Sequence, residues 1–247
     1  MRGGGVYKIK PVLLGKVVQS KGRMTYFFGD LERIDSAIVF WYIEGGDKVV
    51  LVDTGISEPE LKKYSFGMPY EELQSFEEAL SKFGLKPDDI DIIIQTHLHF
   101  DHCANTRKCR NAKVYVQLEE LKFAYSPHAL FAGSYPLEFL KDIDFRTVEG
   151  DREILPGIRV VLTPGHTPGC QSVLIETEKG VSAISGFCSI RENFFPPERI
   201  RGRWPVMAPG VSVNSLQAFD SALKLKSMAD IIIPSHDIEM ACKEELP

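Results

Sequence analysis

Residues 97–102 hold three histidines and an aspartate: His97, His99, Asp101 and His102. Imidazole nitrogens and carboxylate oxygens are the donor atoms that bind zinc, iron, nickel and manganese in proteins. The chain has 6 histidines in 247 residues, so chance does not easily explain this hexapeptide. It predicts a metal site, where a bound ion can activate water and polarise a carbonyl group.

Strand ends position these side chains. The apolar run at residues 90–94 predicts a buried strand that delivers the hexapeptide into a loop, and a loop can turn neighbouring side chains toward one point. His166 follows the apolar run 158–162, and His236 follows the run 231–233. In an α/β protein such strand ends are where sites are usually built. We therefore expect these histidines to join the hexapeptide.

The rest of the pattern predicts one α/β domain, residues 1–247, with two similar halves and no linker. Strands are expected at 6–18, 37–43, 48–52, 91–95, 113–116, 158–162, 172–176, 181–185 and 231–233, and helices at 70–83, 118–124 and 215–227. Gly84 is a suitable end for the first of these helices.

The order of the hexapeptide, His166 and His236 resembles the metallo-β-lactamase fold superfamily, and within it the N-acyl homoserine lactonase branch. Further matching segments are 51–55, 87–89, 149–151, 156–157, 163–169 and 235–239. The resemblance spans nearly the whole chain and implies an αββα sandwich that holds up to two metal ions. By position, it implies that one ion is bound by His97, His99 and His166, and a second by Asp101, His102 and His236.

The resemblance also implies the chemistry. We expect a metal-dependent hydrolase that cleaves a lactone or another ester-like small molecule with metal-activated water, with Asp101 as the nearest general base or a ligand of the second ion. Zinc is the expected metal, as one or two ions, with iron, manganese and nickel as alternatives. Three other functions stay open: a mononuclear, iron-dependent enzyme of the same fold, a metal-binding relative with impaired catalysis, and a hydrolase of phosphate esters or nucleic acid. The acidic balance of the chain disfavours the third.

One family feature is missing. Family members carry an aspartate after the fourth apolar strand that bridges both ions, but the matching position here is Phe187 or Gly186. Neither can bind a metal, so the second site should be weakened more than the first. Cys188 is either a substitute ligand or a small buried residue. The tyrosine that the lactonase branch carries near its substrate is also absent, since residues 189–190 are Ser and Ile.

Several residues are candidates for supporting the site. Asp53 follows an apolar strand, and we expect it either to hydrogen-bond a metal ligand or to stabilise its own turn. Segments 122–140 and 194–210 are rich in aromatic residues and proline, and they include Tyr125 and Trp204. With Phe187, these predict an apolar wall of the substrate pocket; the alternative is that they cover the core or form a homodimer contact. His128 is expected at the surface.

The composition of the chain narrows the classes of molecule that it is expected to bind. With 29 basic and 34 acidic side chains the net charge is −5, and no basic block stands out, which disfavours nucleic acid. No apolar run approaches the roughly 20 residues that cross a bilayer, and the N-terminus lacks the apolar region of a secretory signal. Five cysteines leave at least one unpaired, which fits reduced thiols in a cytoplasmic protein.

Overall fold

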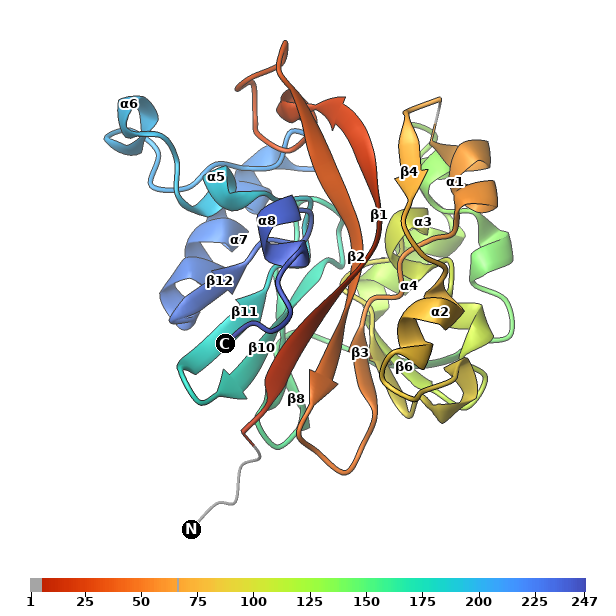
Figure 1. The fold of residues 1–247 in the computed structure, drawn as a ribbon. Helices are drawn as coiled ribbons and strands as arrows, with labels where there is room; N and C mark the ends of the chain where they lie inside the picture. Colours follow the sequence, from red (N-terminus) through yellow and green to blue (C-terminus); the bar gives the residue numbers. More distant parts are fainter. Residues whose placement is uncertain (1–5, 66) are drawn as a thin grey trace.

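The computed structural model describes residues 6–65 and 67–247, and within these ranges the strands form two sheets that face each other (Figure 1). The larger sheet has the order β4-β1-β2-β3-β5-β6-β7 and the smaller sheet the order β12-β11-β10-β9-β8. The strands are β1 (Lys8–Ser20), β2 (Arg33–Glu44), β3 (Val50–Val52), β4 (Tyr70–Glu72), β5 (Ile92–Ile94), β6 (Lys113–Gln117), β7 (Asp144–Val148), β8 (Arg152–Leu155), β9 (Ile158–Leu162), β10 (Gln171–Thr177), β11 (Gly180–Ile184) and β12 (Ile231–Ile233).

Helices cover the outer face of each sheet. The helices are α1 (Glu58–Tyr64), α2 (Phe76–Ser81), α3 (Phe100–Cys103), α4 (Leu118–Tyr125), α5 (Arg191–Phe194), α6 (Glu198–Arg201), α7 (Ser215–Met228) and α8 (Ile238–Ala241). Buried residues of α1, α2 and α4 pack on the larger sheet, and those of α5 and α7 pack on the smaller one. The expected αββα sandwich is therefore confirmed, although the two sheets differ in size.

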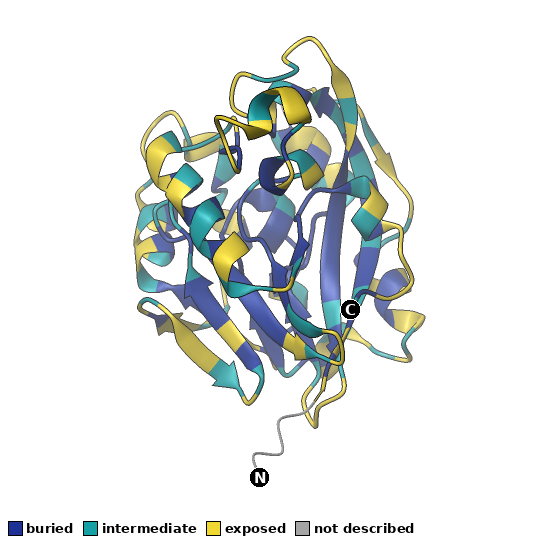
Figure 2. Ribbon diagram, turned by 90° about the vertical axis from the view of Figure 1, so that its left-hand side faces the viewer, coloured by how far each residue is buried: buried dark blue, intermediate teal, exposed yellow. Residues whose placement is uncertain are grey.

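Strand β2 shows how the sequence produces these layers. Successive side chains of a strand point to opposite faces, so Val39 and Trp41 enter the core between the sheets, while Ile38 and Phe40 enter the core beneath the helices. A continuous apolar run is what a strand covered on both faces requires. Figure 2 shows the same division, with buried strands inside and exposed helix surfaces outside.

Strand directions place the site at one edge of the sandwich. Strands β3, β5, β6 and β7 run parallel, and β12 runs parallel to β11. Strand β9 has the same direction as β11, because both pair antiparallel with β10. The carboxyl ends of β9, β11 and β12 therefore lie at one edge of the smaller sheet, so the segments that follow them start side by side.

The helix predicted at 70–83 is wrong in its first part. Tyr70–Glu72 forms the edge strand β4, which pairs with β1, and the helix begins only at Phe76. Ser75 caps this helix: its hydroxyl accepts from the Glu78 backbone N–H, while the Glu78 carboxylate accepts from the Ser75 N–H. This capping box sets the start of the helix, although apolar spacing continues upstream. The helix also ends earlier than expected, at Ser81, and Gly84 lies in the turn that follows, at φ 71°.

Two features of the described residues bear on the thiols and on membrane crossing. The five cysteines all lie within the described residues and are free. No helix in the described ranges is long and apolar enough to cross a membrane.

Candidate metal centre

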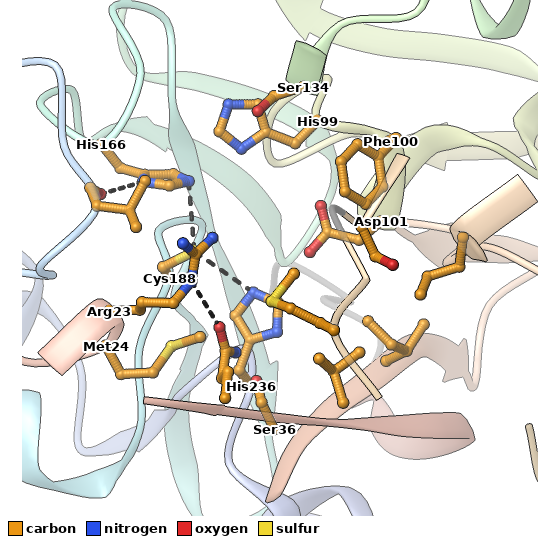
Figure 3. Close-up of a pocket in the computed structure, with 17 residues that line it drawn as sticks. Arg23, Met24, Ser36, His99, Phe100, Asp101, Ser134, His166, Cys188 and His236 are labelled. Atoms are coloured by element: carbon orange, nitrogen blue, oxygen red, sulfur yellow. Dashed lines mark hydrogen bonds between the residues drawn. The ribbon is translucent and has the colours of Figure 1, made fainter. Parts of the chain in front are cut away.

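Five histidines and one aspartate meet at the shared edge of the sheets, in the two groups that the family resemblance implied. In each group the candidate donor atoms lie within 4.8 Å of one another, and the groups are His97, His99 and His166, and Asp101, His102 and His236. The histidines of both groups are buried, and Asp101 is partly exposed. Figure 3 shows His99, Asp101, His166 and His236 around one cavity. The sixth histidine, His128, is exposed, as expected.

Backbone contacts hold the hexapeptide in place. The N–H groups of Thr54 and Gly55, which follow β3, donate to the carbonyl oxygen of His102 at 2.8 and 3.2 Å. Asp53 has a positive φ of 57°, and its Oδ1 accepts from the N–H of Thr96 at 2.8 Å. The loop after β3 therefore positions the loop after β5. Asp53 therefore hydrogen-bonds the segment that leads into the hexapeptide.

Hydrogen bonds fix the proton on His102 and His236. The Nδ1 of His102 donates to the Asp53 carboxylate at 2.7 Å, and the Nδ1 of His236 donates to the Ala37 carbonyl at 2.9 Å. A neutral imidazole has one N–H, so both Nε2 atoms carry lone pairs. These two atoms lie 3.2 Å apart. The lone pairs of the two Nε2 atoms therefore point toward the same position, where a cation could bind both.

His97 and His166 repeat this arrangement. The Nδ1 of His166 donates to the Val211 carbonyl at 2.6 Å. The Thr96 hydroxyl donates to Asp53, so it accepts from the Nδ1 of His97 at 3.1 Å. The two Nε2 atoms lie 3.3 Å apart with their lone pairs facing. His99 adds a buried Nε2 that lacks a hydrogen-bond partner among the described residues.

Burial keeps most of these imidazoles neutral. It lowers the pKa of His97, His99 and His236, and that of His166 to about 4. Burial acts in the same direction on His102, but the carboxylates of Asp101 and Asp53 raise its pKa above the usual value. Burial of Asp101 opposes ionisation, yet the neighbouring imidazoles of His102 and His236 lower its pKa. The site thus offers four neutral imidazoles and a carboxylate, and His102 joins them as a donor when a bound cation displaces the proton from its Nε2.

The spacing of the donor atoms fits a tetrahedral ion. Zinc–nitrogen distances of about 2.0–2.1 Å at a tetrahedral angle place two nitrogens about 3.3 Å apart. The observed Nε2–Nε2 separations of 3.2 and 3.3 Å agree with this value. Two facing lone pairs without a cation between them would repel, so this geometry fits the metal that the sequence predicted.

Cys188 lies between the two groups. Its Sγ is 3.5 Å from the Nε2 of His166 and 3.7 Å from the Nε2 of His236, as the dashed lines in Figure 3 show. The side chain is partly exposed to the cavity, although burial still raises the pKa of its thiol. The sulfur thus contacts one histidine of each group, although the position that matches the family's aspartate is Phe187 or Gly186.

Glu120, which the sequence reasoning missed, joins the loops that hold the first group. Its Oε1 accepts from the Leu98 N–H and the Tyr135 hydroxyl, both at 3.0 Å. Its Oε2 accepts from the Thr167 hydroxyl at 2.5 Å and the Gly169 N–H at 3.2 Å. Leu98 separates His97 from His99, and Thr167 follows His166. No sequence signal singled out this helix residue, because its partners come from distant loops.

The predicted substrate wall is wrong in part. Phe187 is fully buried and packs against Phe194, 5.6 Å between ring centroids, so its side chain belongs to the outer core of the smaller sheet. Trp204 lines a separate surface hollow, and Tyr125 is 56% exposed on α4; neither belongs to the described residues around the histidine cavity. Strands β1 and β2 and the turn between them supply much of the wall instead, and it includes Val17, Gln19, Arg23, Met24, Ser36 and Ile38.

Comparisons with known proteins agree with the site. A family model of the metallo-beta-lactamase superfamily matches residues 34–236. An N-acyl homoserine lactonase of Bacillus cereus is 30% identical over 225 residues, which cover 82% of this chain and 83% of the relative. A solved N-acyl homoserine lactone hydrolase, with the product N-hexanoyl-L-homoserine at its catalytic metal center, is 26% identical. That alignment covers 96% of this chain and 97% of the other, with a TM-score of 0.79. The chain therefore belongs to the metallo-beta-lactamase superfamily.

Proposed function

We propose that this protein is a metal-dependent hydrolase that opens the ester bond of a lactone or a similar small molecule. The observation that carries the proposal is the pairing of imidazole lone pairs at 3.2 and 3.3 Å in a buried cavity. The names of the lactonase relatives support the substrate class. They favour hydrolysis over the iron-dependent oxygen chemistry and the impaired relative that the sequence left open.

We assign one ion to His97, His99 and His166, and a second to Asp101, His102 and His236, and we propose zinc in both positions. When bound, the ions lower the pKa of water to about 7 and polarise the carbonyl under attack. The protein fixes the imidazoles for this task, since the carbonyls of Val211 and Ala37 hold the protons on Nδ1.

Two charged side chains at the cavity complete the proposal. Asp101 is partly exposed, with its Oδ2 3.8 Å from the Nε2 of His102. It acts as a ligand when the second ion is bound and as the nearest proton acceptor when it is not. Arg23 lies on the opposite wall, held by a 2.9 Å bond from its Nε to Gln19 (Figure 3). We propose that its guanidinium stabilises the negative charge that develops on the substrate.

The test compares metal content and hydrolysis in two histidine variants. Purified protein is analysed by mass spectrometry for metal, and hydrolysis is followed with N-acyl homoserine lactones, simple esters and a phosphodiester. The wild-type protein should contain metal and open a lactone or an ester. His97→Ala should lose metal from the first group, and turnover should fall with it, because the ion that lowers the pKa of the attacking water is no longer held.

His128→Ala is the matched control, because it removes an exposed histidine outside both groups. It should keep full metal content and full turnover. A His97→Ala protein that keeps both would contradict the assigned site. Metal bound with no turnover on any lactone or ester would contradict the proposed reaction class, and turnover of the phosphodiester alone would replace it.

A further inference from the structure

The turn after β11 has room for one side chain at the metal centre. A Cβ on Gly186 would lie 1.8 Å from the carbonyl oxygen of Gln171, so this position is closed to the family's aspartate. Phe187 is committed to the core against Phe194. Of residues 186–188, Cys188 is the one whose side chain lines the histidine cavity.

The sulfur has the spacing of a shared ligand. Zinc–sulfur and zinc–nitrogen distances of about 2.3 and 2.0–2.1 Å at a tetrahedral angle place the two donors about 3.6 Å apart. The Sγ of Cys188 lies 3.5 Å from His166 and 3.7 Å from His236, which belong to different groups. One atom therefore has this spacing to one histidine of each group.

The backbone around Cys188 is tied to the second group. The N–H of His236 donates to the carbonyl of Ser189 at 2.9 Å, and the Ser235 hydroxyl donates to the carbonyl of Phe187 at 2.7 Å. These contacts flank Cys188 on both sides. The position of the sulfur against His236 is thus set by fixed backbone atoms, in addition to its own rotamer.

The charge balance of the two groups favours an additional anionic ligand between them. Asp101 is the single carboxylate donor in the two groups, and the other five donors are imidazoles, which add no negative charge when they bind a metal. Two dications held by this set repel each other, and an anionic ligand between them offsets that repulsion. The buried Nε2 of His99, without a partner among the described residues, independently marks the cavity as a ligand site.

We propose that Cys188 binds both ions as a bridging thiolate, in place of the carboxylate that the turn cannot hold. Binding the metal displaces the thiol proton to solvent, and the two metal–sulfur bonds form without any change of oxidation state. The inference rests on the proposed function and adds the identity of the bridging ligand. A thiolate ligand favours zinc and other thiophilic ions over magnesium or calcium.

Cobalt(II) tests the proposal, because its spectrum reports sulfur ligands separately from nitrogen ligands. The metal-free protein is loaded with cobalt and its absorption is recorded, together with the number of ions per chain. The wild type should show visible d–d bands and a near-ultraviolet sulfur-to-cobalt band, with two ions bound. Cys188→Ser should lose the sulfur band, keep d–d bands from the first group, and bind the second ion about tenfold or more weakly.

Cys242→Ser is the matched control, since Cys242 is exposed and does not line the cavity. It should keep the sulfur band, and circular dichroism should show that both variants are folded. Cobalt bound with d–d bands but no sulfur band in the wild type would overturn the bridging thiolate and leave the hydrolase intact. A sulfur band that persists in Cys188→Ser would also overturn it. Failure of the wild type to bind cobalt would overturn the proposed function itself.

Discussion

Replacing Glu120 by Gln should weaken both the fold and the metal site. The Glu120 carboxylate is fully buried and accepts four hydrogen bonds, two at each oxygen. Glutamine has nearly the same shape but accepts at one oxygen, and its amide group then faces two donors. At either oxygen one donor is a hydroxyl, which can rotate away, and the other is a backbone N–H, which cannot.

The expected loss follows from that fixed donor. A buried N–H left without an acceptor costs about 1–3 kcal/mol, and hydrogen bonds to a charged acceptor are stronger than average. We therefore expect Glu120→Gln to lower the free energy of unfolding of the metal-free protein by about 3 kcal/mol. Since the affected N–H groups belong to Leu98 and Gly169, beside the ligand histidines, metal affinity should also fall by about tenfold.

The assay is urea unfolding of the metal-free protein, with metal affinity measured by competition against a chelator. Glu119→Gln is the control, because Glu119 is exposed on the same helix and pairs with Lys122 at the surface. It should change stability by less than about 0.5 kcal/mol. An unchanged urea midpoint and unchanged metal affinity in Glu120→Gln would refute the reasoning.

Three further predictions concern other parts of the site. Asp53→Asn should weaken binding of the second ion by about 10–100-fold in a chelator competition, because the amide cannot accept well from both Thr96 and His102; equal affinity would argue against the supporting role. Gly186→Ala should destabilise the protein by about 3 kcal/mol or more, since its Cβ meets a backbone oxygen; an unchanged thermal midpoint would contradict this close approach. The metal-free protein should become less stable as pH falls from about 6.5 toward 4. His166 has a folded-state pKa of about 4 and an unfolded-state value near 6.5, so the unfolded chain binds more protons in that window. A urea midpoint that does not fall between pH 7 and pH 5 would count against this.

Residue type and local pattern were enough to find the candidate donors. Each histidine of the two groups follows an apolar strand, and parallel strands bring their ends to one edge, so His97, His166 and His236 could be expected together before any coordinates. The layers were also predictable, because continuous apolar runs such as that of β2 require cover on both faces. The family's motif order placed these parts in one architecture.

What escaped prediction depends on contacts between distant segments. In the sequence, Glu120 looks like an ordinary polar residue of a helix. Its role depends on hydrogen bonds to distant segments, among them Thr167, 47 residues later. The direction of Phe187 and the closed space at Gly186 depend on β10 and α5, which no local pattern reveals. The wall around Arg23 arises because β1 and β2 extend past the neighbouring strands of their sheet. The aromatic residues in the later loops, 122–140 and 194–210, had instead suggested that those loops form the wall.

The two groups also make each ion a cross-link between the halves of the chain. His97 and His166 are 69 residues apart, and His102 and His236 are 134 residues apart. A bond that closes a loop of about 100 residues removes roughly 4–5 kcal/mol of conformational freedom from the unfolded chain in the entropic model. The sheets cannot separate until coordination breaks, so bound metal should slow unfolding as a disulfide does. A bound metal would thereby cross-link a chain whose five cysteines are free in the part that the structure describes.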